Sequence, residues 1–109
     1  MENKKNFDKA KDKLEQAINN SLNEIGLFVV AESQVRTPVE SGTLRRSQTF
    51  KADNEKKVVY VGSNVEYDEY VEFGTSKQKA QPHWTPAVME NIEDINKIVK
   101  KHLKKVGDA

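Results

Sequence analysis

One apolar stripe runs through the first third of the chain and constrains its fold more than any other feature. Its members recur at steps of seven, four, four, three and four residues: Phe7, Leu14, Ile18, Leu22, Ile25 and Val29. This spacing places them on one face of a helix, with charged and amide side chains on the opposite face. Because Pro38 disfavours helical geometry at the residue before it, we expect the helix to end near Val35 or Arg36. Gly26 lies inside it and predicts the close approach of another backbone.

The middle of the chain predicts an antiparallel hairpin or small sheet. Residues 44–51 alternate weakly between apolar and polar positions and are predicted as the first strand. Residues 57–62 carry the stronger signal, a run of β-branched and aromatic side chains. Residues 52–55 between them have turn-like composition.

A short helix and a loop are predicted to follow the hairpin. Residues 65–73 combine aromatic and acidic side chains at helical spacing, with a short strand as the alternative. Gly74 ends this segment. Residues 75–81 are polar and rich in Lys and Gln, which predicts an exposed loop or an arm that becomes ordered on assembly.

The chain closes with a predicted amphipathic helix. Thr85 is suited to the N-cap and Pro86 to the first helical position. The apolar face is formed by Val88, Ile92, Ile95, Val99, Leu103 and Val106. The opposite face is basic, and Gly107 is typical of a helix end.

Together these elements predict one α+β domain over residues 1–109, with residues 1–6 and 107–109 frayed. Of the 109 residues, 36% are hydrophobic and 32% are charged. The low hydrophobic and high charged content predicts either a well-solvated surface or a subunit that completes its burial against neighbours. The core is expected at Phe28, Val59, Val61, Phe73, Ile92, Ile95 and Val99.

Composition excludes several classes of function. The 18 basic and 17 acidic residues give a net charge of +1, which argues against a polyanion binder driven by overall charge. The chain has no Cys and only two His, so no disulfide framework, thiol nucleophile or His-rich metal site is expected. The first residues have no signal-peptide pattern, and no apolar run is long enough to span a membrane.

Sequence motifs for catalysis are absent. No phosphate-binding loop, dinucleotide fingerprint, zinc helix or nucleophile elbow occurs, so we predict no enzyme activity, no cofactor and no metal. His83 and Glu72 are the remaining pair for a small hydrolase. His83 is instead interpreted as a partly exposed loop residue, and His102 as a residue at the core edge.

Charge is segregated along the chain. The acids Glu66, Asp68, Glu69 and Glu72 occur with no base among them, and Lys97, Lys100, Lys101, Lys104 and Lys105 with no acid among them. These groups face each other within one chain or pair subunits head to tail. Arg45 and Arg46 are suited to bidentate bonds with a carboxylate such as Glu72. Trp84 is interpreted either as an intersubunit anchor or as a plug of its own core.

Three ordered stretches carry a family resemblance. Residues 37–47 read TPVESGTLRRS, residues 61–67 and 70–75 read VGSNVEY and YVEFGT, and residues 81–87 read QPHWTPA. This set resembles the small neck proteins of long-tailed double-stranded DNA phages, called head–tail joining, tail-completion or minor tail proteins. The family pattern often has Ala at the positions of Asp68 or Glu69. It usually has Phe followed by Leu or Ile where His83 and Trp84 stand.

The resemblance implies a structural virion protein of the neck or tail end, assembled in the host cytoplasm. It implies an oligomeric ring, six-fold or twelve-fold, that binds neighbouring neck and tail-tube proteins while double-stranded DNA passes through the lumen without specific binding. No membrane, cofactor or catalytic residue is implied. Contacts with subunits or neighbours are expected at Arg45, Arg46, Glu66, Glu69, Glu72, Gly74, Thr75, Lys77, Lys79 and Trp84. The alternative is a small DNA-binding module that acts through the C-terminal lysines.

Overall fold

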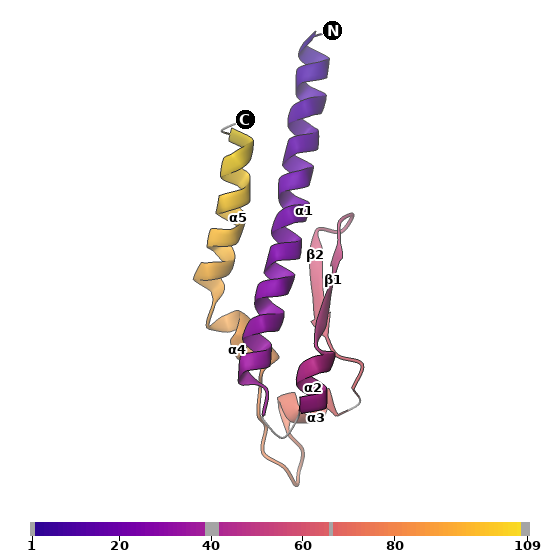
Figure 1. The fold of residues 1–109 in the computed structure, drawn as a ribbon, viewed down its shortest axis with the longest axis vertical. Coiled ribbons are helices and arrows are strands. Elements are labelled where there is room, and N and C mark those ends of the chain that lie inside the picture. Colours follow the sequence, from indigo (N-terminus) through magenta and orange to yellow (C-terminus); the bar gives the residue numbers. More distant parts are fainter. Residues whose placement is uncertain (1, 39–41, 66, 108–109) are drawn as a thin grey trace.

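The chain folds as five helices and one hairpin in the part that the structure describes, residues 2–38, 42–65 and 67–107 of a computed structural model. This α+β architecture is as predicted (Figure 1). The elements in chain order are α1 (Glu2–Arg36), α2 (Gly42–Ser47), β1 (Thr49–Asp53), β2 (Val58–Gly62), α3 (Asp68–Phe73), α4 (Trp84–Met89) and α5 (Ile92–Gly107).

Helix α1 is the central element of the molecule. It lies between α5 on one side and the hairpin on the other, and α5 runs antiparallel to it (Figure 1). The predicted end near Val35 or Arg36 is confirmed, and the Thr37 hydroxyl donates to the carbonyl of Ser33 at 2.8 Å. Residues 2–6, predicted to be frayed, are helical.

The hairpin confirms one predicted strand and corrects the other. β1 pairs antiparallel with β2, with Phe50 opposite Val61. The prediction of one strand over residues 44–51 is wrong, because residues 42–47 form helix α2 and the strand begins only at Thr49. The helical turn lets Leu44 be fully buried, which the weak alternation of residues 44–51 does not reveal.

Gly26 of α1 marks the closest approach of the hairpin. A Cβ atom at this position would lie 2.2 Å from Cδ2 of the Phe50 ring. The close approach predicted from the sequence therefore exists, but it involves the side chain of Phe50 rather than another backbone.

The predicted last helix is divided in two. Residues 90–91 separate α4 from α5, and the Asn91 side chain donates to the carbonyl of Ala87 at 2.9 Å. The N-cap of α4 is His83, not the predicted Thr85, which lies inside the helix. The reason is that a carboxylate from α3 caps this helix from outside, as described below.

The buried core is small. Its apolar members are Ala17, Val29, Leu44, Ala87 and Ile98. None of the seven residues expected in the core is fully buried, and two are exposed, Phe73 by 72% and Ile92 by 46%. These two side chains are exposed because no described element of this chain packs over them.

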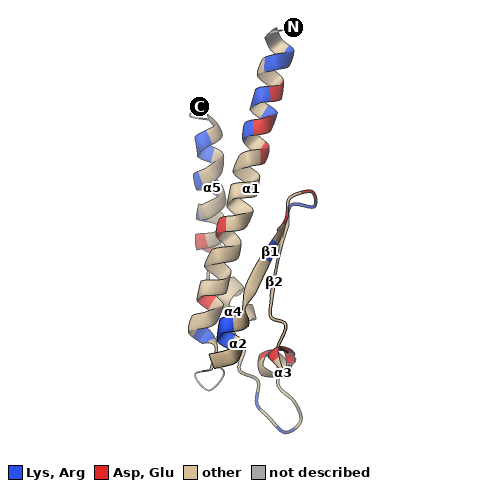
Figure 2. Ribbon diagram, turned by 45° about the vertical axis from the view of Figure 1, so that its right-hand side comes forward, with Lys and Arg blue, Asp and Glu red and all other residues tan. Residues whose placement is uncertain are grey.

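The molecule is elongated, with extents of 66 × 23 × 21 Å. The N-terminal end of α1 projects beyond α5 and the hairpin (Figures 1 and 2), and every residue from 3 to 16 is exposed. We call residues 3–16 the arm. Within the described residues, no helix is both long enough and apolar enough to cross a membrane.

Candidate functional site

The junction of α3 and α4 is organised by the carboxylate of Glu72. One oxygen accepts the backbone N–H groups of His83 and Trp84 at 2.9 and 2.8 Å, and the other accepts that of Thr85 at 3.0 Å. These are N–H groups that a helix start leaves without an intrahelical partner. Burial alone would raise the pKa of Glu72, but the hydrogen bonds from His83, Thr85 and Trp84 outweigh it and lower the pKa.

A second carboxylate, that of Asp68, bonds two aromatic rings. Its Oδ1 lies 2.6 Å from Nε2 of His83, and its Oδ2 accepts the Trp84 indole N–H at 3.1 Å. The other ring nitrogen of His83 lies 3.3 Å from Oε1 of Glu72. The imidazole is thus held between two carboxylates of one short helix.

His83 is fully buried, so its interpretation as a partly exposed loop residue is wrong. The carboxylates of Asp68 and Glu72 contact the imidazole ring, and Glu72 also accepts the backbone N–H of His83. These contacts offset the free-energy cost of burying this polar side chain. The role of Asp68 is the part of this junction that sequence reasoning missed. The sequence does contain a signal for this role. Asp68 lies four residues before Glu72 on a predicted helix, which puts both acids on one face.

A pocket of about 380 Å³ opens beside this junction. Its apolar walls come from Val61, Val65, Phe73 and Trp84, and its acids are Asp68, Glu69 and Glu72. The described lining holds no Lys or Arg. We call it the junction pocket.

The acids expected at an interface differ in their exposure. Glu69 is exposed on α3, whereas Glu72 is only 5% exposed and its oxygens are bonded within the protomer. Glu66 lies outside the described residues. A carboxylate that caps its own chain is not free to bind a neighbour, so Glu69 is the accessible member of this group.

Arg45 and Arg46 lie on α2 rather than on a hairpin strand. Arg45 donates to the carbonyl of Thr37 at 3.0 Å and so ties α2 to the end of α1. Arg46 is exposed. No described hydrogen bond or ion pair joins either guanidinium to Glu72.

The predicted loop of residues 75–81 is a mostly exposed turn. Gly74 precedes it with φ of +77°, a conformation that favours glycine. Thr75 and Gln78 exchange backbone hydrogen bonds, and Lys77 and Lys79 are exposed. Trp84 is half-buried, because its indole is bonded to Asp68 while part of the ring lines the junction pocket.

The C-terminal lysines are separated from the acids of α3. Figures 1 and 2 place α3 near one end of the molecule and the basic C-terminal half of α5 near the other. Their pairing within one chain, left open by the sequence, is therefore excluded for the described residues.

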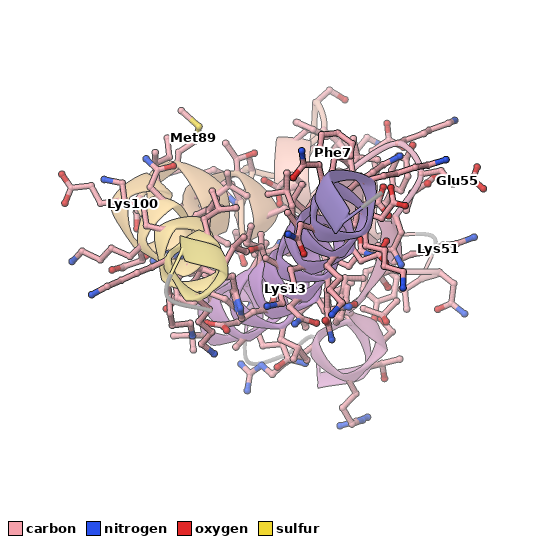
Figure 3. All side chains as sticks on the ribbon, turned by 90° about the horizontal axis from the view of Figure 1, so that it is seen from above. Phe7, Lys13, Lys51, Glu55, Met89 and Lys100 are labelled. Atoms are coloured by element: carbon pink, nitrogen blue, oxygen red, sulfur yellow. The ribbon has the colours of Figure 1, made fainter. Side chains whose placement is uncertain are left out.

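One of these lysines has a partner on α1. Lys101 and His102 bond to the carboxylate of Glu24, at 2.7 and 2.9 Å. Both hydrogen bonds lower the pKa of Glu24, and the bond from Lys101 has the larger effect. The four other lysines are exposed and form no ion pair with described residues, and Lys100 points away from α1 (Figure 3): Lys97, Lys100, Lys104 and Lys105.

The buried polar groups of the junction are bonded to one another within the protomer. Across residues 2–38, 42–65 and 67–107, no group of three or more His, Asp or Glu side chains is placed to hold a metal ion. The His83 ring is buried and bonded on both sides, so it does not face a substrate. The junction serves to fix α3, the loop and α4 relative to one another.

Comparison with known protein families gives a match over most of the chain. The HK97-gp10-like family model, described as "Bacteriophage HK97-gp10, putative tail-component", matches residues 2–74. No curated protein and no solved structure matches the chain. The match extends from α1 through Gly74, so it includes the first stretch that carried the resemblance and all of the second except Thr75, and the third stretch follows it.

Proposed function

Because the chain belongs to the HK97-gp10-like family of phage tail components, we propose that it is a structural protein of the phage neck or tail end. In this role it joins the head to the tail or completes the tail, as an oligomeric ring around the DNA channel. It acts through interfaces, with no catalytic step.

The main support for a ring is the large accessible surface area of the protomer. The accessible surface is 8015 Å² for a mass of 12.4 kDa. A compact monomer of this mass exposes about 6,100 Å² by the usual scaling, so the excess is about 1,900 Å². A ring subunit makes two contacts, and each buries about 800 Å² of its surface in an interface of standard size.

The exposed apolar residues support the same conclusion. Large hydrophobic side chains are exposed on four helices, including Leu27 and Val35 on α1, Phe73 on α3, Met89 on α4 and Ile92 on α5. We place contacts with subunits or neck and tail-tube proteins at the accessible members of the expected set, which are Arg46, Glu69, Thr75, Lys77, Lys79 and the exposed part of Trp84. DNA passes through the lumen without specific binding.

Two measurements test this function. Light scattering of the purified protein over a concentration range is expected to show a discrete multimer, six-fold or twelve-fold. Deleting the gene from the phage or prophage that encodes it is expected to leave separate heads and tails in electron micrographs. Complete particles in the absence of the protein would contradict the assignment.

A DNA-binding module is the second candidate, because Lys97, Lys100, Lys104 and Lys105 form an exposed basic face on α5. Phosphate contacts by several lysines would make binding to duplex DNA fall steeply with salt. Titration at two salt concentrations tests this directly. Replacing the four lysines by Gln abolishes binding if the face acts on DNA, and no binding by the wild type at low salt excludes this function.

A further inference from the structure

The arm is exposed along its whole length. Its base, at Lys13 and Gln16, shares a pocket with α5. An isolated helix of this length is marginal in water, because helices in proteins are stabilised by packing of an apolar face. The arm nevertheless has such a face, since Phe7 is 68% exposed and Leu14 43% exposed.

The chemistry of that face is specific. Lys4 and Lys11 stand three residues before and four residues after Phe7, so the three side chains share one side of the helix. Lys5 and Lys9, two residues away on either side, point in another direction. The arm thus presents an aromatic side chain between two ammonium groups.

The junction pocket is complementary to this arrangement. Val61, Val65, Phe73 and Trp84 offer apolar contact for a ring. Glu69, the accessible acid of the lining, offers a partner for a cation, because its carboxylate is exposed and forms no hydrogen bond or ion pair with described residues. Phe73, 72% exposed beside it, extends the apolar surface.

A single chain cannot bring the two together. The arm and α3 lie at opposite ends of a molecule 66 Å long (Figure 1), and Phe7 is on the arm (Figure 3). An arm that enters the pocket must therefore belong to another molecule. Because the two surfaces differ, the contact is head to tail, the type that closes into rings.

We propose that the arm of one copy docks on a second copy, with Phe7 in the junction pocket and Lys4 and Lys11 near the Glu69 carboxylate. This inference rests on the proposed function, in that it names the contact between ring subunits.

Cross-linking tests the contact in a chain that has no cysteine of its own. Asn3→Cys puts a thiol one turn from Phe7, and Thr85→Cys puts one in the lining of the pocket. The two full-length proteins, one carrying a mass tag, are mixed and treated with a short bis-maleimide. A mixed dimer is expected, whereas Asn3→Cys mixed with Glu55→Cys, at the hairpin turn, yields none. No mixed dimer, or only a product joining two Asn3→Cys chains, overturns the proposal.

Charge reversal provides a matched pair of variants. The Lys4→Glu/Lys11→Glu double variant is expected to weaken self-association, measured by sedimentation, by about tenfold or more. The Lys5→Glu/Lys9→Glu variant has the same net charge and is expected to associate as the wild type does. Adding Glu69→Lys to the first variant restores part of the association. Equal loss in both pairs would show that only net charge matters and would refute the contact.

The two proposals fail in different ways. If phage particles contain the Lys4→Glu/Lys11→Glu variant at the wild-type level, the contact is rejected and the tail role stands. If the cross-link forms in solution but particles lack the protein, the tail role is rejected and the contact stands.

Discussion

At the scale of single residues, Asp68, His83 and Trp84 form one bonded unit. The Asp68 carboxylate bonds both rings and so makes a polar bridge between α3 and α4. Either half of this bridge alone would leave buried polar groups unpaired.

Replacing Glu72 by Gln is expected to destabilise the protein by about 1–3 kcal/mol at pH 7, because three backbone N–H groups lose a charged acceptor. Urea unfolding measures this change. Glu69→Gln is the control, since this neighbour on α3 is exposed and its loss should cost less than about 0.5 kcal/mol. Equal stability of the two variants would contradict the capping role.

The same pair of variants predicts a pH dependence. The pKa of Glu72 is lower in the folded protein than in the unfolded chain, so its contribution is fully present above the unfolded pKa, near ~4.3. That contribution is lost as pH falls through the folded pKa, where the carboxyl protonates in both states. The difference in unfolding free energy between the wild type and Glu72→Gln should therefore shrink below about pH 4. A constant difference down to pH 2 would contradict this sign.

Gly26→Ala tests the contact between α1 and the hairpin. A Cβ here would lie 2.2 Å from the Phe50 ring, and such overpacking costs about 1–3 kcal/mol, against the ~1 kcal/mol that Ala gains over Gly in a helix. We expect a net loss of unfolding free energy in thermal or urea melts. Gly107→Ala, where no neighbouring atom lies within 4 Å, is the control and should be neutral or stabilising.

At the scale of elements, the sequence predicted the helices and strands whose ends are determined by neighbouring residues in the chain. The end of α1 follows from Pro38, and β2 follows from a run of β-branched residues. Helix α2 was missed because its reason for being helical is tertiary, namely the buried site of Leu44. The start of α4 was misplaced for a related reason, because its cap is Glu72, eleven residues before His83, rather than the adjacent Thr85.

The arm is predicted to be separable from the rest of the fold. Removing residues 2–12 deletes a part of α1 in which residues 3–12 are all exposed, so the remaining chain should unfold cooperatively with its free energy changed by less than about 0.5 kcal/mol. Circular dichroism should show less helix with an unchanged melting midpoint at low protein concentration. Loss of the cooperative transition would mean that the arm supports the fold of its own protomer.

At the scale of the whole molecule, the sequence indicated incomplete burial but could not say where it occurs. A low hydrophobic fraction is a property of composition, whereas the exposure of Phe7 and Phe73 depends on which residues of the chain reach them. Stripe positions such as Phe7 and Ile92 match the periodicity of core residues. Only the fold shows that neither residue has a described element packed over it. In a subunit of an assembly, the sequence pattern of an interface residue is therefore the same as that of a core residue.

Assembly should therefore appear as stability that depends on concentration. A contact that forms only between folded chains adds about 2.7 kcal/mol when the partner concentration is 100 times Kd, which raises the melting midpoint of a domain this size by about 10 °C or more. We expect this rise in calorimetry of the wild type and of Lys5→Glu/Lys9→Glu over a hundredfold concentration range. The chain lacking residues 2–12 should melt at one temperature throughout. If its midpoint rises as steeply as that of the wild type, the subunits associate through surfaces other than the arm, and the excess surface must be covered elsewhere.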